Sequence, residues 1–411
     1  MYIRKRSFFE IIFSLTVVFF VCMGIRFVYV LGATNLRWLC ALIVFCYLAL
    51  TKKLLKYVNL NWKMLLLIYL VWCMSTTLWS EVPLLSFSKS TLFSFNVIVM
   101  ISAGALWVIK FGYARSLNWL FWVLVFAFIS GFLGTATTSI FYKGLTWNPN
   151  EFGFLMAITS SYLFLKLYQN KKNKMMLAMW IFVLLIDIHF LVASYSRSSF
   201  VIFLFILGFF ILSLPLSKKI LVSISSFFLI VIVLVMTPVS YLESTISKHI
   251  LKNPDNLIID PNAPILLQSR SFVWQESYRQ AMKGGIMGGG FSVTIGDANF
   301  SNKQIEGIGY GREKGNSQFA IMEETGLIGL VLYLSVLILF FTLVFPWYFR
   351  LKGADKVAMG LVLGSIFGLL AESIVEAWWD SAAGPELICF WTLVGVVYGM
   401  IYLQKRKFLA F

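Results

Sequence analysis

The sequence predicts an all-α polytopic membrane protein, with about 12 transmembrane helices and one long, partly helical extracytoplasmic loop. Of the 411 residues, 60% are hydrophobic and 13% are charged, whereas a soluble protein carries about 25% charged residues. Apolar runs of about 20 residues, the length that crosses a bilayer, recur along the chain. One long polar segment, residues 239–318, interrupts them. It contains aromatic residues and a helical pattern, which predict an ordered loop that carries the chemistry.

The chain divides into three predicted parts: spans 1 to 9 within residues 1–238, the loop at 239–318, and spans 10 to 12 within residues 319–411. The predicted spans are residues 8–30, 35–50, 63–80, 91–109, 117–135, 151–168, 175–194, 199–214, 219–238, 320–345, 357–378 and 385–403. No internal repeat and no linker that would separate a soluble domain is visible in the sequence.

The loop contains one amphipathic stretch, from Ser269 to Met282. Its candidate buried residues are Phe272, Val273, Tyr278 and Met282, and its polar residues are Arg270, Glu276 and Arg279. This pattern predicts a helix that lies along the membrane surface or caps the bundle.

The formal net charge of +16 is explained by the orientation of the chain in the membrane rather than by nucleic-acid binding. Basic residues occupy every alternate short loop: 4–6, 52–56, 110–115, 171–174, 218–219, 350–352 and 405–407. The long loop is nearly balanced, with eight Lys or Arg against seven Asp or Glu. Because basic loops stay inside, we expect a multi-pass protein with both termini in the cytoplasm and the loop outside. The lipid bilayer is the expected partner, and acidic lipids are a secondary one.

The sequence shows no cofactor or metal signature. The five cysteines lie inside apolar segments, and the two histidines, His189 and His249, form no ligand cluster at zinc spacing. These residues therefore predict no metal site.

Four places on the predicted outer side combine polar residues with helix starts. Asn148-Pro149-Asn150 precedes the sixth span, where a capped helix start is the simpler explanation. Arg197, within Ser194–Ser199, either reaches the outer headgroups or holds a phosphate. Arg270 and Trp274 lie four apart on one helix face, a cation beside a sugar-stacking or lipid-facing ring, and Arg279 follows. The glycine run 284–290 favours a flexible turn or a close backbone approach.

The fourth place is residues 315–329, which join the loop to the tenth span. Glu323 and Glu324 start an otherwise apolar helix, where a carboxylate is electrostatically favoured. This electrostatic effect explains one of the two glutamates, and the other glutamate is a candidate acid, base or arginine partner. Glu372, Glu376 and Asp380 recur every four residues in the eleventh span, so they are expected to share one face and to pair with arginines or act in function.

These places, in this order, resemble the O-antigen ligase and polymerase superfamily of bacterial membrane glycosyltransferases. The resemblance rests on Asn148 to Asn150, Ser194 to Ser198, Ser269-Arg270 with Trp274 leading to Gly288 and Gly290, and Asn316 to Gly329, so it covers roughly the second half of the chain. It implies transfer of undecaprenyl-pyrophosphate-linked glycans at the outer face of the bacterial cytoplasmic (inner) membrane, without nucleotide or metal. Both donor and acceptor would be lipid-linked, and a chain-length regulator is a further candidate partner.

The resemblance implies roles for individual residues. Arg197, Arg270 and Glu324 match its catalytic positions, with the arginines near the pyrophosphate. We add Asn148, Asn150, Trp274, Arg279, Asn316 and Glu376 as substrate-binding candidates. Two departures stand out: ligases usually carry a histidine immediately before Asn316, where this chain has Gly315, and the proline common before the glycine turn is replaced by Gly285.

Three functions remain open on the sequence. The missing histidine removes the proposed base of a ligase and favours a polymerase that joins lipid-linked repeat units. Glu323, Glu324 or His249 could then activate the acceptor. A ligase that transfers glycan to lipid A core is the second reading. A transporter or flippase of lipid-linked glycans is the third, although two similar halves with broken helices are not visible.

Overall fold

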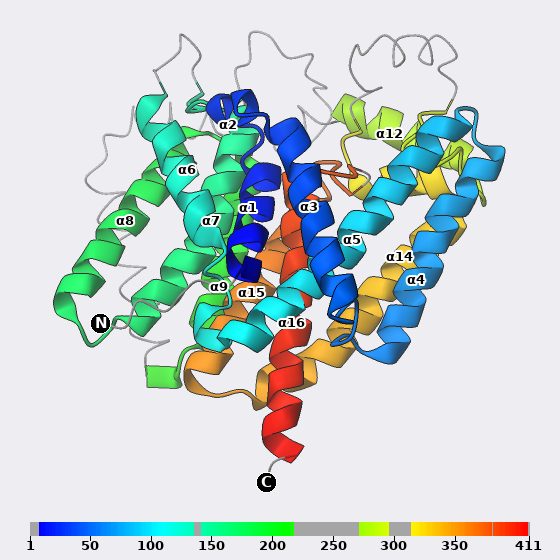
Figure 1. Cartoon of the computed structure of the whole chain (residues 1–411). Helices are drawn as coiled ribbons and strands as arrows, with labels where there is room; N and C mark the ends of the chain where they lie inside the picture. The colour runs from blue at the N-terminus through cyan, green and yellow to red at the C-terminus, as the bar shows by residue number, and fades with distance from the viewer. Residues whose placement is uncertain (1–7, 135–140, 218–270, 296–313, 380, 410–411) are drawn as a thin grey trace.

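The computed structural model describes residues 8–134, 141–217, 271–295, 314–379 and 381–409, and their regular elements are helices (Figure 1). These are α1 (Phe8–Val21), α2 (Arg26–Val30), α3 (Ala33–Leu50), α4 (Leu60–Ser75), the 3-10 helix η1 (Thr76–Trp79), α5 (Pro83–Phe111), the 3-10 helix η2 (Tyr113–Arg115), α6 (Leu120–Leu133), α7 (Pro149–Gln169), α8 (Lys174–Ala193), α9 (Arg197–Ser213), α12 (Ser271–Gly284), α14 (Ser317–Arg350), α15 (Gly353–Glu372) and α16 (Pro385–Leu409). The predicted all-α class is confirmed.

Eight helices of the described chain are long and apolar enough to cross a membrane. They are Ala33–Leu50, Leu60–Trp79, Pro83–Phe111, Tyr113–Leu133, Lys174–Ala193, Ser317–Arg350, Gly353–Glu372 and Pro385–Lys407. Two more apolar helices, Phe8–Val21 and Arg197–Ser213, are shorter. The predicted ninth span, residues 219–238, lies outside the described residues, as does most of the long loop. The chain is therefore a multi-pass membrane protein, and the total of about 12 spans stays a prediction.

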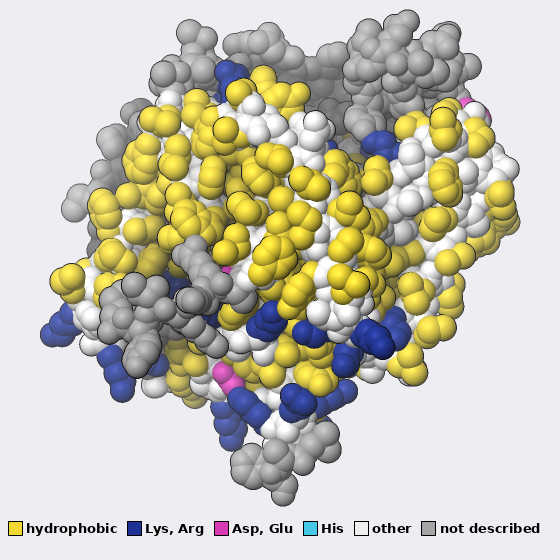
Figure 2. Space-filling model, in the orientation of Figure 1, with side chains coloured by type: hydrophobic (Ala, Val, Ile, Leu, Met, Phe, Trp, Pro, Cys, Tyr) yellow, Lys and Arg dark blue, Asp and Glu magenta, His cyan; other side chains and the backbone are white. Residues whose placement is uncertain are grey.

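The two ends of the bundle differ in charge. Most of the visible Lys and Arg side chains gather at the lower end, around the C-terminus, below a broad apolar band (Figure 2). Helix α12 lies at the opposite end, together with the starts of α7 and α14 (Figure 1). We call these the basic end and the α12 end. This polarity agrees with the charge pattern of the loops, in which basic residues prefer the inside.

Small residues bring the helices that carry the site into close contact. On α15, Gly360, Gly364 and Gly368 follow a four-residue spacing and face α9, where a Cβ on Gly364 or Gly368 would lie 2.9 or 2.7 Å from backbone Cα atoms. The hydrophobic effect does not drive helices together inside a membrane, and glycine stripes stabilise their association by allowing close van der Waals packing. The pairing fixes the start of α9 beside the end of α15.

Two predicted spans end differently in the structure. Residues 8–30 form two helices rather than one, because the chain between them leaves the helix: Ile25 forms an antiparallel bridge with Thr146, and the Arg26 amide donates to the Leu145 carbonyl at 3.0 Å. The span predicted to end at 378 ends at Glu372. There the Ser317 amide donates to the Ser373 carbonyl, and the side chain of Asn316, the N-cap of α14, donates to the Ile374 carbonyl.

The amphipathic helix expected in the long loop is present as α12, but its buried face differs from the prediction. Tyr278 and Met282 are each 53% exposed, and the buried positions are Ser277 and Ala281, followed by Gly284. The side chain of Phe272 lies outside the described ones. Small residues form this face because α12 packs closely on α14: a Cβ on Gly284 would lie 2.4 Å from the Met322 carbonyl oxygen.

Candidate active site at the α12 end

The start of α14 is fastened to residues 373–379, the segment that follows α15. The Asn316 side chain caps α14 by accepting from the Phe319 amide at 3.0 Å, and its Nδ2 donates to the Ile374 carbonyl at 2.8 Å. Ser317 Oγ donates to the Glu376 carbonyl at 3.0 Å and accepts from the Trp378 amide at 3.1 Å. Asn316 is only 6% exposed. Its amide is therefore used to hold the segment in place.

The starts of α7 and α9 join the same segment. Asn148 caps α7, accepting from the Asn150 amide at 2.9 Å, and Asn150 Nδ2 donates to Glu376 Oε1 at 3.2 Å. Ser199 on α9 donates to the Asn150 carbonyl at 3.4 Å. Gly153 makes this approach feasible, since a Cβ there would lie 2.7 Å from the Cβ of Ser196. Three helix starts thus meet around residues 373–379.

Arg197 is the first residue of α9 and is half-buried. The preceding Ser196 caps the helix, and the following Ser198 lies within hydrogen-bonding range of Glu372. A helix start carries partial positive charge, which favours an anion there. The guanidinium and the helix start together make this the most suitable anion site among the described residues of the junction.

Carboxylates from four elements approach one another beneath this junction. Glu372, Glu376 and Glu386 lie within electrostatic range of one another, and Glu151 lies within range of Glu386. One oxygen each of Glu151 and Glu372 is buried and has no hydrogen-bond partner among the described residues. Glu372 as a whole is 3% exposed. These unused acceptors distinguish the cluster from ordinary helix-capping carboxylates.

A second pair of carboxylates, Glu323 and Glu324, has a different environment. Glu324 pairs with Lys314 and also accepts from the Ser292 amide at 2.7 Å, while Glu323 accepts from the Ile295 amide at 3.2 Å. Both are 1% exposed. Their side chains hold the residues that follow the glycine run, and Glu324 also holds Lys314, which precedes α14.

The glycine run is an ordered backbone crossing rather than a flexible turn. The Gly289 and Gly290 amides each donate at 2.9 Å, to the carbonyls of Glu323 and Glu324. At the crossing Gly326 adopts φ of 70° and interrupts α14, and a Cβ on Gly288 would lie 2.3 Å from the Glu324 carbonyl oxygen. The close backbone approach expected from the sequence is therefore present, and it serves the fold.

Helix α12 covers the position before Asn316. The Trp274 indole donates to the Gly315 carbonyl at 2.9 Å, and Ser277 Oγ accepts from the Gly315 amide at 3.3 Å. A Cβ on Gly315 would lie 2.6 Å from Val273 Cγ1 and 3.1 Å from Trp274 Cδ1. The space that a side chain at position 315 would need is filled by α12.

A comparison with known protein families finds one match. Residues 180–334 match the family model described as O-Antigen ligase. The match supports the resemblance to the O-antigen ligase/polymerase superfamily. It contains Arg197, Trp274, Asn316 and Glu324, whereas Asn150 and Glu376 lie outside it. No curated protein matches the chain significantly.

The match to the O-antigen ligase family model points to a glycosyltransferase-like ligase or polymerase activity, with lipid-linked glycans as the substrate class and a membrane environment. It supports the enzyme predicted from the sequence over a transporter.

The fold brings several predicted residues together. Asn148, Asn150, Arg197, Asn316 and Glu376 belong to the junction, joined by the hydrogen bonds described above. Trp274 and Glu324 lie beside it on α12 and α14. Arg279 lies away from the junction contacts, with a side chain 72% exposed and paired with Glu276 at 3.0 Å. Arg270, Asp380 and His249 lie outside the described residues.

Sequence reasoning missed Glu151, Glu386 and Lys314. A signal for the first two was present, because an acidic residue directly after Asn148-Pro149-Asn150, and another after Gly384-Pro385, sits at the start of a membrane helix. Lys314 had no such signal, since only the fold places it against Glu324.

Proposed function

We propose that the protein is a polysaccharide polymerase that joins undecaprenyl-pyrophosphate-linked repeat units at the outer face of the bacterial cytoplasmic membrane. The observation that carries this choice within the superfamily is the environment of Gly315. Val273 is stiff because it is β-branched, and it occupies the space that the histidine of a ligase would need. A mechanism without that histidine requires another proton acceptor, and the carboxylates of the junction offer one.

The proposed reaction is a displacement at the sugar carbon bound to the donor pyrophosphate. The acceptor hydroxyl oxygen forms the new bond to this carbon, the bond from the carbon to the pyrophosphate oxygen breaks, and undecaprenyl pyrophosphate leaves with the electron pair. Arg197 and the start of α9 stabilise the charge that develops on the leaving group, and Arg270 is proposed to act with them. Glu376 takes the hydroxyl proton.

The other proposed residues position these groups. Asn150 orients the Glu376 carboxylate through its hydrogen bond at 3.2 Å, and Asn148 fixes the start of α7. Asn316 fixes the segment that carries Glu376. Trp274 offers a ring edge to the sugar while its indole holds Gly315. Glu324 is proposed to act through Lys314 and the glycine crossing, which it positions. Arg279, exposed on α12, is proposed to meet incoming glycan.

The test is an assay of the purified protein with a synthetic undecaprenyl-pyrophosphate repeat unit, without added nucleotide or metal, and with products separated by size. A ladder of multiples is expected. The parallel reaction contains donor and lipid A core. Transfer to the core, with no ladder, would contradict the polymerase and establish a ligase. Movement of intact donor across vesicles without any joined product would contradict both enzymes.

A further inference from the structure

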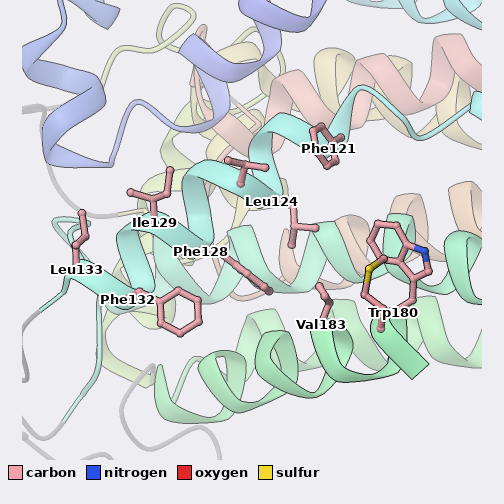
Figure 3. A pocket seen from close by; sticks show the side chains of 10 residues that line it. Phe121, Leu124, Phe128, Ile129, Phe132, Leu133, Trp180 and Val183 are labelled. Carbon is pink, nitrogen blue, oxygen red and sulfur yellow. The ribbon is translucent and has the colours of Figure 1, made fainter. Parts of the chain in front are cut away.

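Two hollows on the surface of the bundle differ in what lines them. The groove between α6 and α8 is walled by hydrophobic side chains, such as Phe128 of α6 and Trp180 of α8 (Figure 3). The acyl chains of any bilayer can cover such a surface, so it selects no particular ligand. A second pocket lies at the basic end, and its lining includes two lysines and three tyrosines. We call it the basic-end pocket.

The basic-end pocket lies between the residues before α4, the last turns of α14 and the end of α16 (Figure 1). Its volume is about 170 Å³, below the roughly 300–1,000 Å³ of pockets that enclose a whole drug-sized ligand. Leu343 of α14 and Ile401 of α16 contribute apolar surface, and Lys56 and Lys405 are its exposed cations. The pocket therefore suits a small charged group attached to an apolar body.

The positive charge of the pocket is not neutralised by described residues of the protein. No described carboxylate lines it. Lys407 pairs with Asp355 at 3.3 Å, whereas Lys56 and Lys405 form no ion pair within the described chain. Lys405 instead lies over the Trp347 ring, with its Nζ 5.8 Å from the ring centroid. A phosphate in the pocket would meet two cations that have no acidic partner there.

Tyr398 provides a second, independent observation. It lines the pocket and is 2% exposed, and its hydroxyl has no hydrogen-bond partner among the described residues. Its ring packs against Trp62 and Phe340, at centroid distances of 5.0 and 5.7 Å. The large majority of buried side-chain polar atoms have a hydrogen-bond partner. The Tyr398 hydroxyl is therefore available to donate to a phosphate oxygen in the pocket.

The backbone that carries Lys56 is held in place. The preceding Leu55 amide donates to Ser102 Oγ of α5 at 2.9 Å. Asn59, which lines the pocket, caps the start of α4. The partial positive charge of this helix start adds to the charge of the lysines. The cations of the pocket thus come from two ordered elements, the residues before α4 and the end of α16.

We propose that the basic-end pocket binds the phosphate headgroup of an anionic phospholipid from the leaflet at that end of the bundle. The phosphate lies between Lys56 and Lys405 and accepts from the Tyr398 hydroxyl, while the acyl chains continue past Leu343 into the bilayer. The bound lipid links the residues before α4 to the ends of α14 and α16, and so stabilises this end of the bundle. The inference is independent of the proposed function, because the pocket lies at the end opposite the candidate active site.

The first experiment measures binding to the unaltered, full-length protein in detergent. Its unfolding temperature is followed while dioleoyl phosphatidylglycerol, dioleoyl phosphatidylcholine or inorganic phosphate is added. Phosphatidylglycerol should raise the unfolding temperature in a saturable manner, from which an apparent Kd follows. The other two should give little change. An equal rise with phosphatidylcholine would show a general lipid effect, and an equal rise with inorganic phosphate would show a soluble-anion site; either would overturn the proposal.

The second experiment removes the cations. Lys56→Gln combined with Lys405→Gln should raise the apparent Kd for phosphatidylglycerol roughly tenfold or more. The matched control is Lys172→Gln combined with Lys352→Gln, which removes the same charge from exposed lysines that do not line the pocket. This control should bind like the wild type. Equal weakening by both pairs would show that diffuse surface charge attracts the lipid and would overturn the pocket.

Tyr398→Phe separates binding from folding. Without phosphatidylglycerol this variant should unfold at the wild-type temperature or above, because only a hydroxyl without a protein partner is removed. Its apparent Kd for phosphatidylglycerol should rise roughly tenfold. A wild-type response to the lipid would overturn the assigned hydrogen bond and the proposal with it.

A labelling experiment needs no variant. Phosphatidylglycerol with a diazirine in its headgroup is photolysed on the wild-type protein, and the labelled peptides are identified. Label is expected within residues 56–59 and 398–405, and unlabelled phosphatidylglycerol should displace it more effectively than phosphatidylcholine does. Label confined to other segments would overturn the inference.

Discussion

Two pairs of glutamates at the α12 end differ in what surrounds their oxygens. Glu323 and Glu324 accept from backbone amides, and Glu324 also pairs with Lys314, so their charge is used to build the glycine crossing. Glu372 keeps one buried oxygen without a partner among the described residues, and Glu376 accepts a side-chain hydrogen bond from Asn150. Most buried polar atoms have a hydrogen-bond partner, so the unused acceptor distinguishes Glu372 from Glu323 and Glu324. The contacts of the first pair are structural, and the proposed function places the chemistry at the second pair.

Removal of the anion site should have the largest effect. Arg197→Ala is expected to lower the polymerisation rate by roughly 10²- to 10³-fold, the loss seen when one donor to a developing charge is removed. Arg197→Lys should recover part of this rate, because a point charge remains while the fork of donors is lost. The measurement is the initial rate of ladder formation at saturating donor. An undiminished ladder from Arg197→Ala would remove this residue from the reaction.

Loss of the buried ion pair should lower stability. Glu324→Gln leaves the Lys314 charge unpaired in a site where the two side chains are 1% and 8% exposed, which is expected to cost about 3–5 kcal/mol of unfolding free energy. The control is Glu276→Gln, whose partner Arg279 is exposed, with an expected cost of about 0–1 kcal/mol. Both are compared by unfolding in detergent. Equal stability of the two variants would show that Glu324 has no such structural role.

The packing at position 315 should respond to a single added carbon. Gly315→Ala places a methyl group against Val273 and is expected to cost about 1–3 kcal/mol. Gly208→Ala, on α9, is the control, because nothing lies within 4 Å of its added Cβ. Gly315→His should lose polymerase activity, and Val273→Ala combined with it should recover stability. A stable Gly315→His protein that transfers glycan to lipid A core would contradict the steric argument.

The indole hydrogen bond of α12 should have the smallest effect. Trp274→Phe removes the donor to the Gly315 carbonyl, at an expected cost of about 0.5–1.5 kcal/mol. Trp391→Phe is the control, since this buried indole nitrogen has no partner among the described residues, and its loss of stability should come from lost volume alone. An identical effect on substrate affinity from both changes would show that Trp274 does not contact the sugar.

The sequence predicted the helical class and most helix positions because apolar runs and helix caps are local signals. Asn148, Ser196 and Asn316 are caps, as their residue types suggest. The sequence could not predict the break in the helix between Val21 and Arg26, because this break depends on pairing with residues 145–146, far along the chain. The contact of α12 with Gly315 and the pairing of Lys314 with Glu324 likewise arise only from tertiary packing. Local patterns thus located the helix starts, and the fold determined which of their side chains meet.

The most direct test of the account sets Glu376→Gln beside Glu324→Gln and measures, for each variant, the unfolding temperature and the single-turnover rate of joining two repeat units per folded molecule. We expect Glu376→Gln to keep the wild-type unfolding temperature and to lose the reaction, because the proton acceptor is gone. We expect Glu324→Gln to unfold at lower temperature and to retain the rate in its folded fraction. The reverse pattern, with a stable but inactive Glu324→Gln protein and an active Glu376→Gln protein, would contradict the assignment of chemistry to the Glu372–Glu376 pair.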